Sequence, residues 1–332
     1  MPTIRQVAEK ARVSPTTVSH VINNTRFVSK DVQRRVRAAM DELGYRPNAL
    51  ARSLRRGETH TLGLVLPDSA NPFFAEVGRC IESAAFELGY SVILCNTEGD
   101  SAKEHLYLDV LSKKQVDGVI FVATGHQADA LRVLLRQMPV VVVDRDLPDV
   151  EVDAVLADNR RGGYLATQHL VDLGHRRIGC IAGPSNVTPS AQRVTGYREA
   201  LFEANLPVDE SLILRGDFHP ESGWAAARNL LSRPDAPTAL FACNDLMAIG
   251  VMRAAAETGR RVPADLAIVG FDDIELATYT IPPLTTIGQP KMEMGRAAVK
   301  LLVDRICDRA RPLHRELLPT QLVVRGSCGG HV

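Results

Sequence analysis

Apolar residues recur at helical spacing in the first 45 residues, in three short groups separated by polar capping residues. The groups are Val7, Ala8 and Ala11; Val18, Val21 and Ile22; and Val32, Val36, Ala39, Met40 and Leu43. Each group fits one face of an amphipathic helix. Thr3, Ser14 and Ser29 stand where an N-cap is expected, and Gly44 is expected to end the third helix. Two short helices followed by a covering third predict a helix-turn-helix.

The polar face of the second predicted helix is the part that would enter a DNA major groove. Pro15 starts this helix, and Thr16, Thr17 and His20 lie opposite its apolar stripe. Threonine hydroxyls pair with several bases, so they specify a sequence only weakly. The candidate DNA-contacting residues of this module are Thr3, Ser14, Pro15, Thr16, Thr17, His20, Asn23 and Arg26.

A short basic segment, residues 47–57, follows the helix-turn-helix. Pro47 begins it, Asn48 is a cap and Gly57 ends it. A helix of this length is marginal in water by itself, which suits a segment that folds on DNA. Its candidate DNA-contacting residues are the basic Arg52 and Arg55 and an apolar wedge for a minor-groove step, Leu54.

From residue 59 onward, runs of valine, isoleucine and leucine alternate with amphipathic stretches. The strand-like runs are 59–67, 91–96, 117–123, 139–144, 154–158, 177–183, 238–244 and 266–272, and helical spacing appears at 74–88 and 162–173. This alternation predicts parallel sheets covered by helices on both faces. The number of units exceeds one small sheet. We therefore expect two similar α/β subdomains with a cleft between them.

Ligands of open parallel sheets bind outside the carboxyl ends of the strands, so the residues that follow each run are the candidate site. They are Asn71, Phe73, Phe74, Asp144, Arg145, Ser190, Arg193, Phe218, Asn244, Asp272 and Gln289. The three phenylalanines can cover the apolar faces of a sugar ring, and the charged and amide groups can bond its hydroxyls. As a set they predict a small-sugar site, although each residue alone also fits a strand-end cap or a hinge.

Charge is distributed unevenly along the chain. The net charge is zero, yet residues 1–60 hold 12 Lys and Arg against 5 Asp and Glu, and the remainder holds 27 against 34. A basic N-terminal module is typical of nucleic-acid binding. The six cysteines lie at least 15 positions apart, which is typical of buried thiols in a reducing cytosol. The sequence shows no signal peptide or membrane-length apolar run, so we expect a cytoplasmic protein.

Two other functional classes need to be weighed. Asp144 with Asp146, or Asp272 with Asp273, would suit the paired carboxylates of a glycosidase, but beside Arg145 they are better explained as hydroxyl acceptors. No phosphate-binding glycine loop or metal-ligand spacing occurs, so we expect no enzyme, cofactor or metal. A sugar-transport module would share the cleft, but the basic N-terminal helices argue against it.

The strings TIRQVAEKARVSPTTVSHVIN (3–23) and ALARSL (49–54) resemble the LacI family of bacterial transcription repressors. Later motifs extend the resemblance over essentially the whole chain. It implies a helix-turn-helix domain (1–46), a hinge helix and linker (47–60) and a periplasmic-binding-protein-like core (61–332). The core would divide at about 61–160 with 291–320, and 161–290 with 321–332. The resemblance also implies a homodimer on palindromic operator DNA, with Leu54 inserted at its centre.

Within the family, the chain is most similar to ribose-responsive repressors and next to purine-responsive ones. Its 185–192 loop lacks an arginine that the purine-responsive members have, and Arg145 replaces their tryptophan. The strings CNTEGD (95–100) and DDIELA (272–277) also resemble ribose-responsive members, although Arg145 departs from some of these and matches sugar-binding proteins. We expect ribose or a related small sugar to relieve operator binding. Another pentose or hexose, or a purine corepressor, is the alternative. The closing GSCGGHV has no heptad pattern, which favours a dimer over a tetramer.

Overall fold

The computed structural model describes residues 2–23, 26–46, 58–123, 129–147 and 149–329. Contacts within the chain divide it into two units, Met1–Thr59 and His60–Val332. The predicted hinge helix at 47–57, with Arg52, Leu54 and Arg55, lies outside the described residues.

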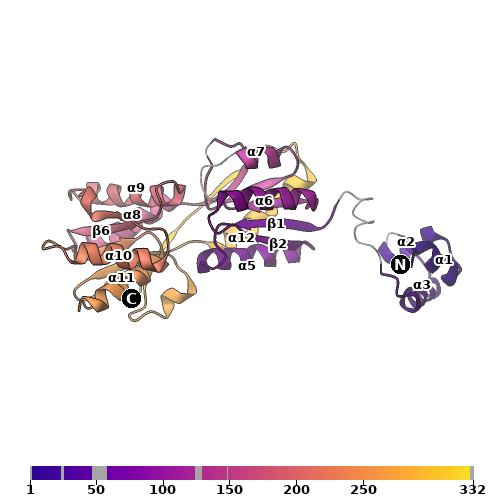
Figure 1. Ribbon diagram of the computed structural model, residues 1–332, viewed down its shortest axis with the longest axis horizontal. Helices are drawn as coiled ribbons and strands as arrows, with labels where there is room; N and C mark the ends of the chain where they lie inside the picture. Colours follow the sequence, from indigo (N-terminus) through magenta and orange to yellow (C-terminus); the bar gives the residue numbers. More distant parts are fainter. Residues whose placement is uncertain (1, 24–25, 47–57, 124–128, 148, 330–332) are drawn as a thin grey trace. The chain divides into compact units, whose positions relative to one another are not determined.

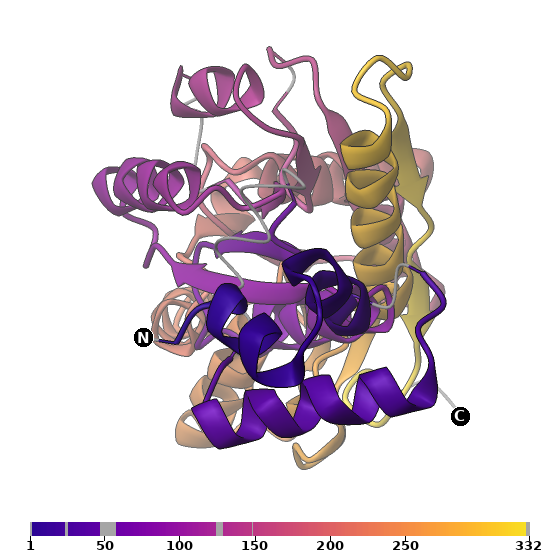
Figure 2. The ribbon, with the colours of Figure 1, turned by 90° about the vertical axis from the view of Figure 1, so that its right-hand side faces the viewer.

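Within residues 2–23 and 26–46, the first unit contains three helices, as the apolar spacing predicts. They are α1 (Ile4–Ala11), α2 (Pro15–Asn23) and α3 (Lys30–Leu43), which pack together in Figure 2. Their shared core consists of Val7, Ala8, Ala11, Val18, Val36 and Ala39. Helices this short are unstable in isolation, so burial of this common core is what stabilises them.

The second unit contains two six-stranded sheets. The first has the order β11-β5-β4-β3-β1-β2, with all neighbours parallel. Its strands are β1 (Thr61–Leu66), β2 (Ser91–Asn96), β3 (Gly118–Phe121), β4 (Val140–Val143), β5 (Asp153–Ala157) and β11 (Arg315–Leu318). Helices intervene between β1 and β2, between β2 and β3, and between β3 and β4, which is the usual crossover in a parallel sheet.

The second sheet has the order β12-β10-β9-β8-β6-β7, and only its edge pair β12 and β10 is antiparallel. Its strands are β6 (Ile178–Ala182), β7 (Ile213–Arg215), β8 (Ala239–Ala242), β9 (Ala267–Asp272), β10 (Thr285–Gly288) and β12 (Gln321–Val323). The apolar runs did not reveal β11 and β12, since these strands have three or four residues and several partly exposed positions.

Helices cover both faces of each sheet (Figure 1). The first sheet lies between α5 (Pro72–Glu87) with α12 (Lys291–Cys307) and α6 (Ser101–Lys113) with α7 (Asp129–Leu135). The second lies between the pairs α8 (Asn159–Asp172) with α9 (Thr188–Glu203) and α10 (Pro220–Leu231) with α11 (Asp245–Glu257). Short 3-10 turns, η1 (Glu210–Leu212) and η2 (Glu275–Thr278), complete this subdomain.

The chain passes between the two sheets after β5, after β10 and after β11. The central strands are buried on both sides, as in β4, β6, β8 and β9, where every residue is buried. These continuous apolar runs fix the strands, and the polar residues that follow them emerge at the carboxyl edges of the sheets. Two similar α/β subdomains therefore present their strand ends to a shared cleft, as the sequence pattern predicts.

Candidate DNA-binding and effector sites

Local hydrogen bonds shape the helix-turn-helix. The Thr3 hydroxyl accepts from the Gln6 amide (3.4 Å), and the Gln6 side chain accepts from the Thr3 amide (2.8 Å), which completes the predicted capping box. The Ser14 hydroxyl accepts from the Thr17 amide at 3.1 Å and lies 2.9 Å from the Thr17 hydroxyl. Ser14 therefore begins α2, and one predicted DNA-contacting hydroxyl, Thr17, also takes part in the cap.

The candidate DNA-contacting side chains differ in exposure. Thr3, Ser14, Pro15, Thr16 and Arg26 are exposed, whereas Thr17, His20 and Asn23 are half-buried. Thr16 and His20 are one helical turn apart on the side of α2 away from buried Val18. The Asn23 side chain donates to the Ser19 carbonyl at 2.8 Å, so part of its role is to finish the helix. The structure thus keeps a polar, accessible face on α2.

The carboxyl edges of the two sheets enclose a cavity with an empty volume of ≈ 300 Å³. Nine of the eleven predicted ligand residues line it: Asn71, Phe73, Phe74, Asp144, Arg145, Arg193, Phe218, Asn244 and Asp272. A wider cavity of ≈ 970 Å³ shares Asn71, Phe74, Arg145, Val187 and Phe218 with it. The residues come from both subdomains, so a ligand here would contact both.

Two buried carboxylates dominate the chemistry of this cavity. Asp144 lies 3.9 Å from the Arg145 guanidinium, and Asp272 lies 3.5 Å from that of Arg193. Within the described part of the chain, Asp144 Oδ1 is buried and has no hydrogen-bond partner. A buried carboxylate oxygen without a partner is costly, and a ligand hydroxyl donated to it would remove that cost.

Arg193 is held rigidly in the wall of the cavity. Its Nε donates to Asn159 Oδ1 at 2.7 Å, its Nη1 donates to the Cys243 carbonyl at 2.5 Å, and its guanidinium lies 3.6 Å from the centroid of the Phe271 ring. The approach of α9 to α8 requires glycine, because a Cβ at Gly163 would lie 2.1 Å from the Arg193 carbonyl oxygen. A ligand therefore meets a charge whose direction is already fixed.

The backbone is strained where the cavity residues leave their strands. Asp144, Phe218 and Asp272 have φ values of 66°, 72° and 111°, in the left-handed region that favours glycine. Each such residue costs about 1–3 kcal/mol and persists only where its surroundings hold it. Strain of this kind concentrates at functional sites, and here three strained residues line one cavity.

Burial also changes the acidity of the cavity groups. It raises the pKa of Asp144, against the opposing charges of Arg145 and Arg193. It raises the pKa of Asp272 to about 6, against Arg193 and the hydrogen bond from Gln289. Burial lowers the pKa of Arg145, which the neighbouring Asp144 carboxylate opposes. Desolvation is the largest cause in each case, as expected for charges in a closed site.

Several predicted residues support the site as well as lining it. Asn71 Oδ1 accepts from the Phe73 amide at 3.0 Å and caps α5, and Asn244 Oδ1 accepts from the Met247 amide at 2.9 Å and caps α11. Asn244 Nδ2 also donates to the Phe218 carbonyl at 3.0 Å. These amides set the positions of the phenylalanines, which is the strand-end capping that the sequence left as an alternative.

Ser190 and Gln289 are placed differently from the other predicted residues. Neither lines the cavity. Gln289 lies behind Asp272 and donates to its Oδ1 at 2.8 Å. Ser190 is fully buried in the first turn of α9. Conversely, the sequence pattern did not indicate two apolar lining residues, Val187 and Pro189, although they stand at the start of α9, just after the loop where ligand residues were expected.

The chain combines a helix-turn-helix unit with a ligand cleft between two sheets. This combination defines a class of proteins, the DNA-binding regulators that have a small-molecule site. Comparison with known proteins identifies the particular family. Residues 3–48 match the model of the bacterial regulatory proteins of the lacI family, and residues 167–328 match a periplasmic binding protein-like domain.

Two relatives match over almost the full length. The ribose operon repressor of Escherichia coli (strain K12) is 44% identical over 98% of this chain and 100% of its own. The HTH-type transcriptional repressor PurR of Photobacterium profundum is 41% identical over 98% of both chains. The chain belongs to the LacI family.

Solved structures agree with this assignment. The lac repressor dimer bound to operator and the anti-inducer ONPF is 30% identical, covers 98% of both chains and has a TM-score of 0.88. A LacI-family regulator from Enterococcus faecium with bound ribose is 35% identical, covers 81% of this chain and 98% of its own, and has a TM-score of 0.74. The protein is a DNA-binding repressor with a ligand-binding domain, in a non-enzymatic family whose members bind operator DNA as dimers. None of the helices in the described ranges has the length and apolarity to cross a membrane.

Proposed function

We propose that this repressor binds ribose, or a closely related small sugar, in the cavity between its sheets, and that the sugar relieves operator binding. The observation that carries the proposal is the pair of buried carboxylates, Asp144 and Asp272, each beside an arginine in a cavity walled by phenylalanine. Carboxylates accept hydrogen bonds from hydroxyl donors, and ring faces of a sugar pack on aromatic side chains. The ribose complex of the Enterococcus faecium regulator supports the same ligand class.

The eleven predicted residues take two roles in this proposal. Those lining the cavity, together with Ser190, contact the sugar, and Gln289 supports Asp272 from behind. Asn71, Phe73 and Phe74 come from the first subdomain, and Arg193, Phe218 and Asp272 from the second. Because the sugar would bond both, it favours one relative arrangement of the subdomains and can shift the equilibrium between two states of the repressor.

We also propose how the chain divides its work. Residues 1–46 read the DNA through Thr16, Thr17 and His20, residues 47–60 form the hinge with its Leu54 wedge, and residues 61–332 bind the effector and pair two subunits. The repressor acts in the bacterial cytoplasm, on a palindromic operator at the nucleoid. Coupling of about 1–3 kcal/mol between the two sites would give roughly five- to 150-fold relief of repression.

The test is operator binding at fixed salt by the purified protein, alone, with ribose and with hypoxanthine. Salt is held constant because phosphate contacts make affinity strongly salt-dependent. Weaker binding with ribose supports the proposal. Tighter binding with hypoxanthine would show that a purine corepressor occupies the cavity and would overturn it. If neither compound acts, ribose is not the effector, and a panel of pentoses and hexoses tests the broader sugar class.

A further inference from the structure

A third buried carboxyl, besides those of Asp144 and Asp272, lies next to the cavity without lining it. Asp245 is the first residue of α11, follows Asn244 and is fully buried. Helix α11 is already capped by Asn244, whose Oδ1 accepts from the Met247 amide. Both hydrogen bonds of the Asp245 side chain run instead to residues outside α11. Capping therefore does not explain why a carboxyl stands here.

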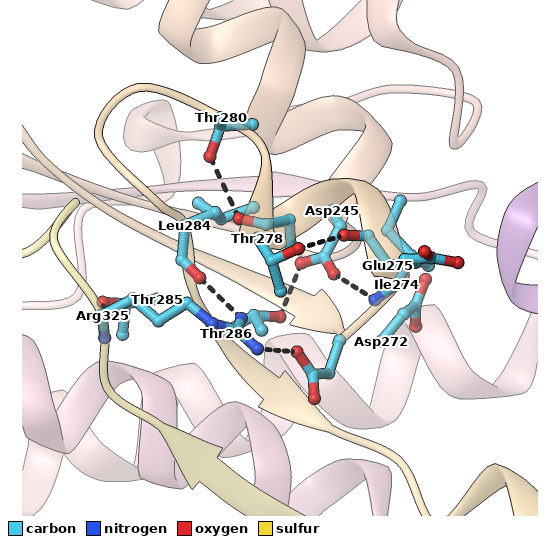
Figure 3. Close-up of polar contacts among 12 residues, drawn as sticks. Asp245, Asp272, Ile274, Glu275, Thr278, Thr280, Leu284, Thr285, Thr286 and Arg325 are labelled. Atoms are coloured by element: carbon cyan, nitrogen blue, oxygen red, sulfur yellow. Dashed lines mark hydrogen bonds and ion pairs between the residues drawn. The ribbon is translucent and has the colours of Figure 1, made fainter.

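Asp245 connects the turn after β9 to the neighbouring strand β10 (Figure 3). Its Oδ2 accepts from the Ile274 amide at 2.9 Å, and its Oδ1 lies 2.5 Å from the Thr286 hydroxyl. Gly270 in β9 leaves room for this carboxyl, since a Cβ there would lie 2.2 Å from Asp245 Oδ1. Strand β9, the turn that follows it and strand β10 thus all contact the Asp245 side chain.

The turn that Asp245 holds is the one that presents Asp272 to the cavity. Asp272 and Asp273 are consecutive residues with positive φ, 111° and 52°. The Lys291 ammonium donates to the carbonyl oxygens of both, at 3.1 and 2.5 Å, and itself pairs with Glu76 at 2.7 Å. Lys291 holds the carbonyls of the turn, and Asp245 holds the amide that follows them. A strained conformation persists only when its surroundings over-determine it in this way.

Keeping a carboxyl at this position is costly. Burial raises the pKa of Asp245 well above its usual range, and the negative charge of Asp272 raises it further. A buried apolar side chain would avoid that cost, as is generally true of buried charges. What an apolar side chain would not supply is an acceptor for the Ile274 amide.

Resting on the proposed function, we propose that Asp245 is a positioning residue of the effector site. It contacts no sugar; it fixes residues 272–274 so that the Asp272 carboxyl points at the ligand. Without it, the Ile274 amide is left buried and unsatisfied and the strained turn relaxes. An asparagine can replace it, because an amide oxygen accepts from Ile274 and an amide nitrogen donates to the Thr286 hydroxyl.

The experiment compares the full-length wild type with Asp245→Ala and Asp245→Asn by ribose titration calorimetry. We expect Asp245→Ala to weaken ribose binding by about 5- to 150-fold, the equivalent of one lost buried hydrogen bond. We expect Asp245→Asn to keep most of the affinity. Operator binding without sugar should be the same for all three proteins.

A matched control separates positioning from general loss of stability. Tyr197→Phe removes another buried hydrogen bond of the same subdomain, from the Tyr197 hydroxyl to the Ile178 carbonyl at 2.7 Å. It should lower the melting temperature but leave ribose affinity unchanged. Amide hydrogen exchange gives a readout without sugar, since exchange at Ile274 should accelerate in Asp245→Ala and not in Tyr197→Phe.

Three results would overturn the positioning role: wild-type ribose affinity in Asp245→Ala, equal losses in Asp245→Ala and Asp245→Asn, or an equal loss in Tyr197→Phe. Failure of the wild type to bind ribose would instead overturn the proposed effector. In that case the exchange rate at Ile274 still decides whether Asp245 fixes the turn, so the two failures are distinguishable.

Discussion

The helix-turn-helix and the effector cavity are built by opposite means. In the first, the capping bonds join residues three positions apart, as in Thr3 with Gln6 and Ser14 with Thr17. In the second, the side chain of Arg193 reaches Asn159 and Cys243, which are 34 and 50 positions away. The DNA-contacting candidates in the described residues stay exposed or half-buried, whereas the effector cavity holds buried charges, of which Asp144 and Asp272 lie on strained backbone.

This difference suggests that the two functions can be damaged separately. The cap bonds described in the helix-turn-helix are local, and the side chains that line the cavity belong to the two sheet-containing subdomains. Substitutions in one unit should leave the binding function of the other intact, although they can remove the coupling between them.

Asp272→Ala is expected to have the largest effect: it should abolish most sugar binding while leaving operator binding intact. It removes a buried carboxylate beside Arg193 and leaves the Arg193 charge without that partner. The loss costs about 2–5 kcal/mol of binding free energy and weakens sugar affinity by roughly 30-fold or more. Operator affinity without sugar should be unchanged. The measurement is operator release on titration with ribose. Asp265→Ala is the control, since that carboxylate of the same subdomain pairs locally with Arg261. Normal release by Asp272→Ala would remove Asp272 from the site.

Leu54→Ala in the proposed hinge is expected to do the reverse: it should weaken operator binding and leave sugar binding intact. Loss of a minor-groove wedge should weaken specific operator binding by about tenfold or more, because a wedge offsets a few kcal/mol of unstacking. Ribose affinity should equal that of the wild type. Operator and non-specific DNA are compared at one salt concentration. Equal weakening on both would mean that Leu54 contributes no specificity.

The acidity of Asp272 affects folding stability: the carboxylate that is proposed to bind the sugar lowers the stability of the folded protein at high pH. Its pKa rises from an ordinary 3.8 to about 6 in the folded protein. Between these values the folded state keeps a proton that the unfolded state has lost, so stability falls as pH rises from about 4 to about 6. Asparagine does not titrate. Asp272→Asn should therefore be more stable than the wild type at pH 8, by up to about 3 kcal/mol, and gain nothing at pH 4.

Thermal unfolding of the wild type and Asp272→Asn at pH 4 and pH 8 checks this prediction. The comparison is made without sugar, so that differences in affinity play no part. A stability difference that is the same at both pH values would show that the Asp272 carboxyl does not titrate in this window.

The smallest effect is expected from Ser14→Ala in the helix-turn-helix. It removes the acceptor for the Thr17 amide and should destabilise α2 by about 1 kcal/mol, the usual cost of losing an N-cap. Amide exchange in α2 should accelerate while the melting of the core stays unchanged, and Ser14→Thr should restore the cap. A lower melting temperature for the core would contradict the independence of the two units.

Sequence patterns predicted most of the architecture because its signals are local. The stripe through Val7, Ala8 and Ala11 and the valine run at 140–143 each determine one element, and polar residues after buried strands indicate the cavity edge. Short strands such as β12 were not predicted, since three residues are too few to show the alternation of apolar and polar positions that indicates a strand. The roles within the site were harder: Asn71 and Asn244 were predicted as ligand residues, yet their side-chain oxygens cap helices.

By itself, then, the sequence determined most of the segments that become helices and strands, where the basic DNA-binding unit lies and which residues gather at the strand ends. Only the tertiary structure decided how those residues divide the work. It placed Gln289 behind Asp272, left Asp144 Oδ1 without a partner in the described chain, and set Asp245 beneath a strained turn. The physical reason is that apolar periodicity is a property of neighbouring residues. Burial, pKa and hydrogen-bond satisfaction depend on groups brought together from distant strands.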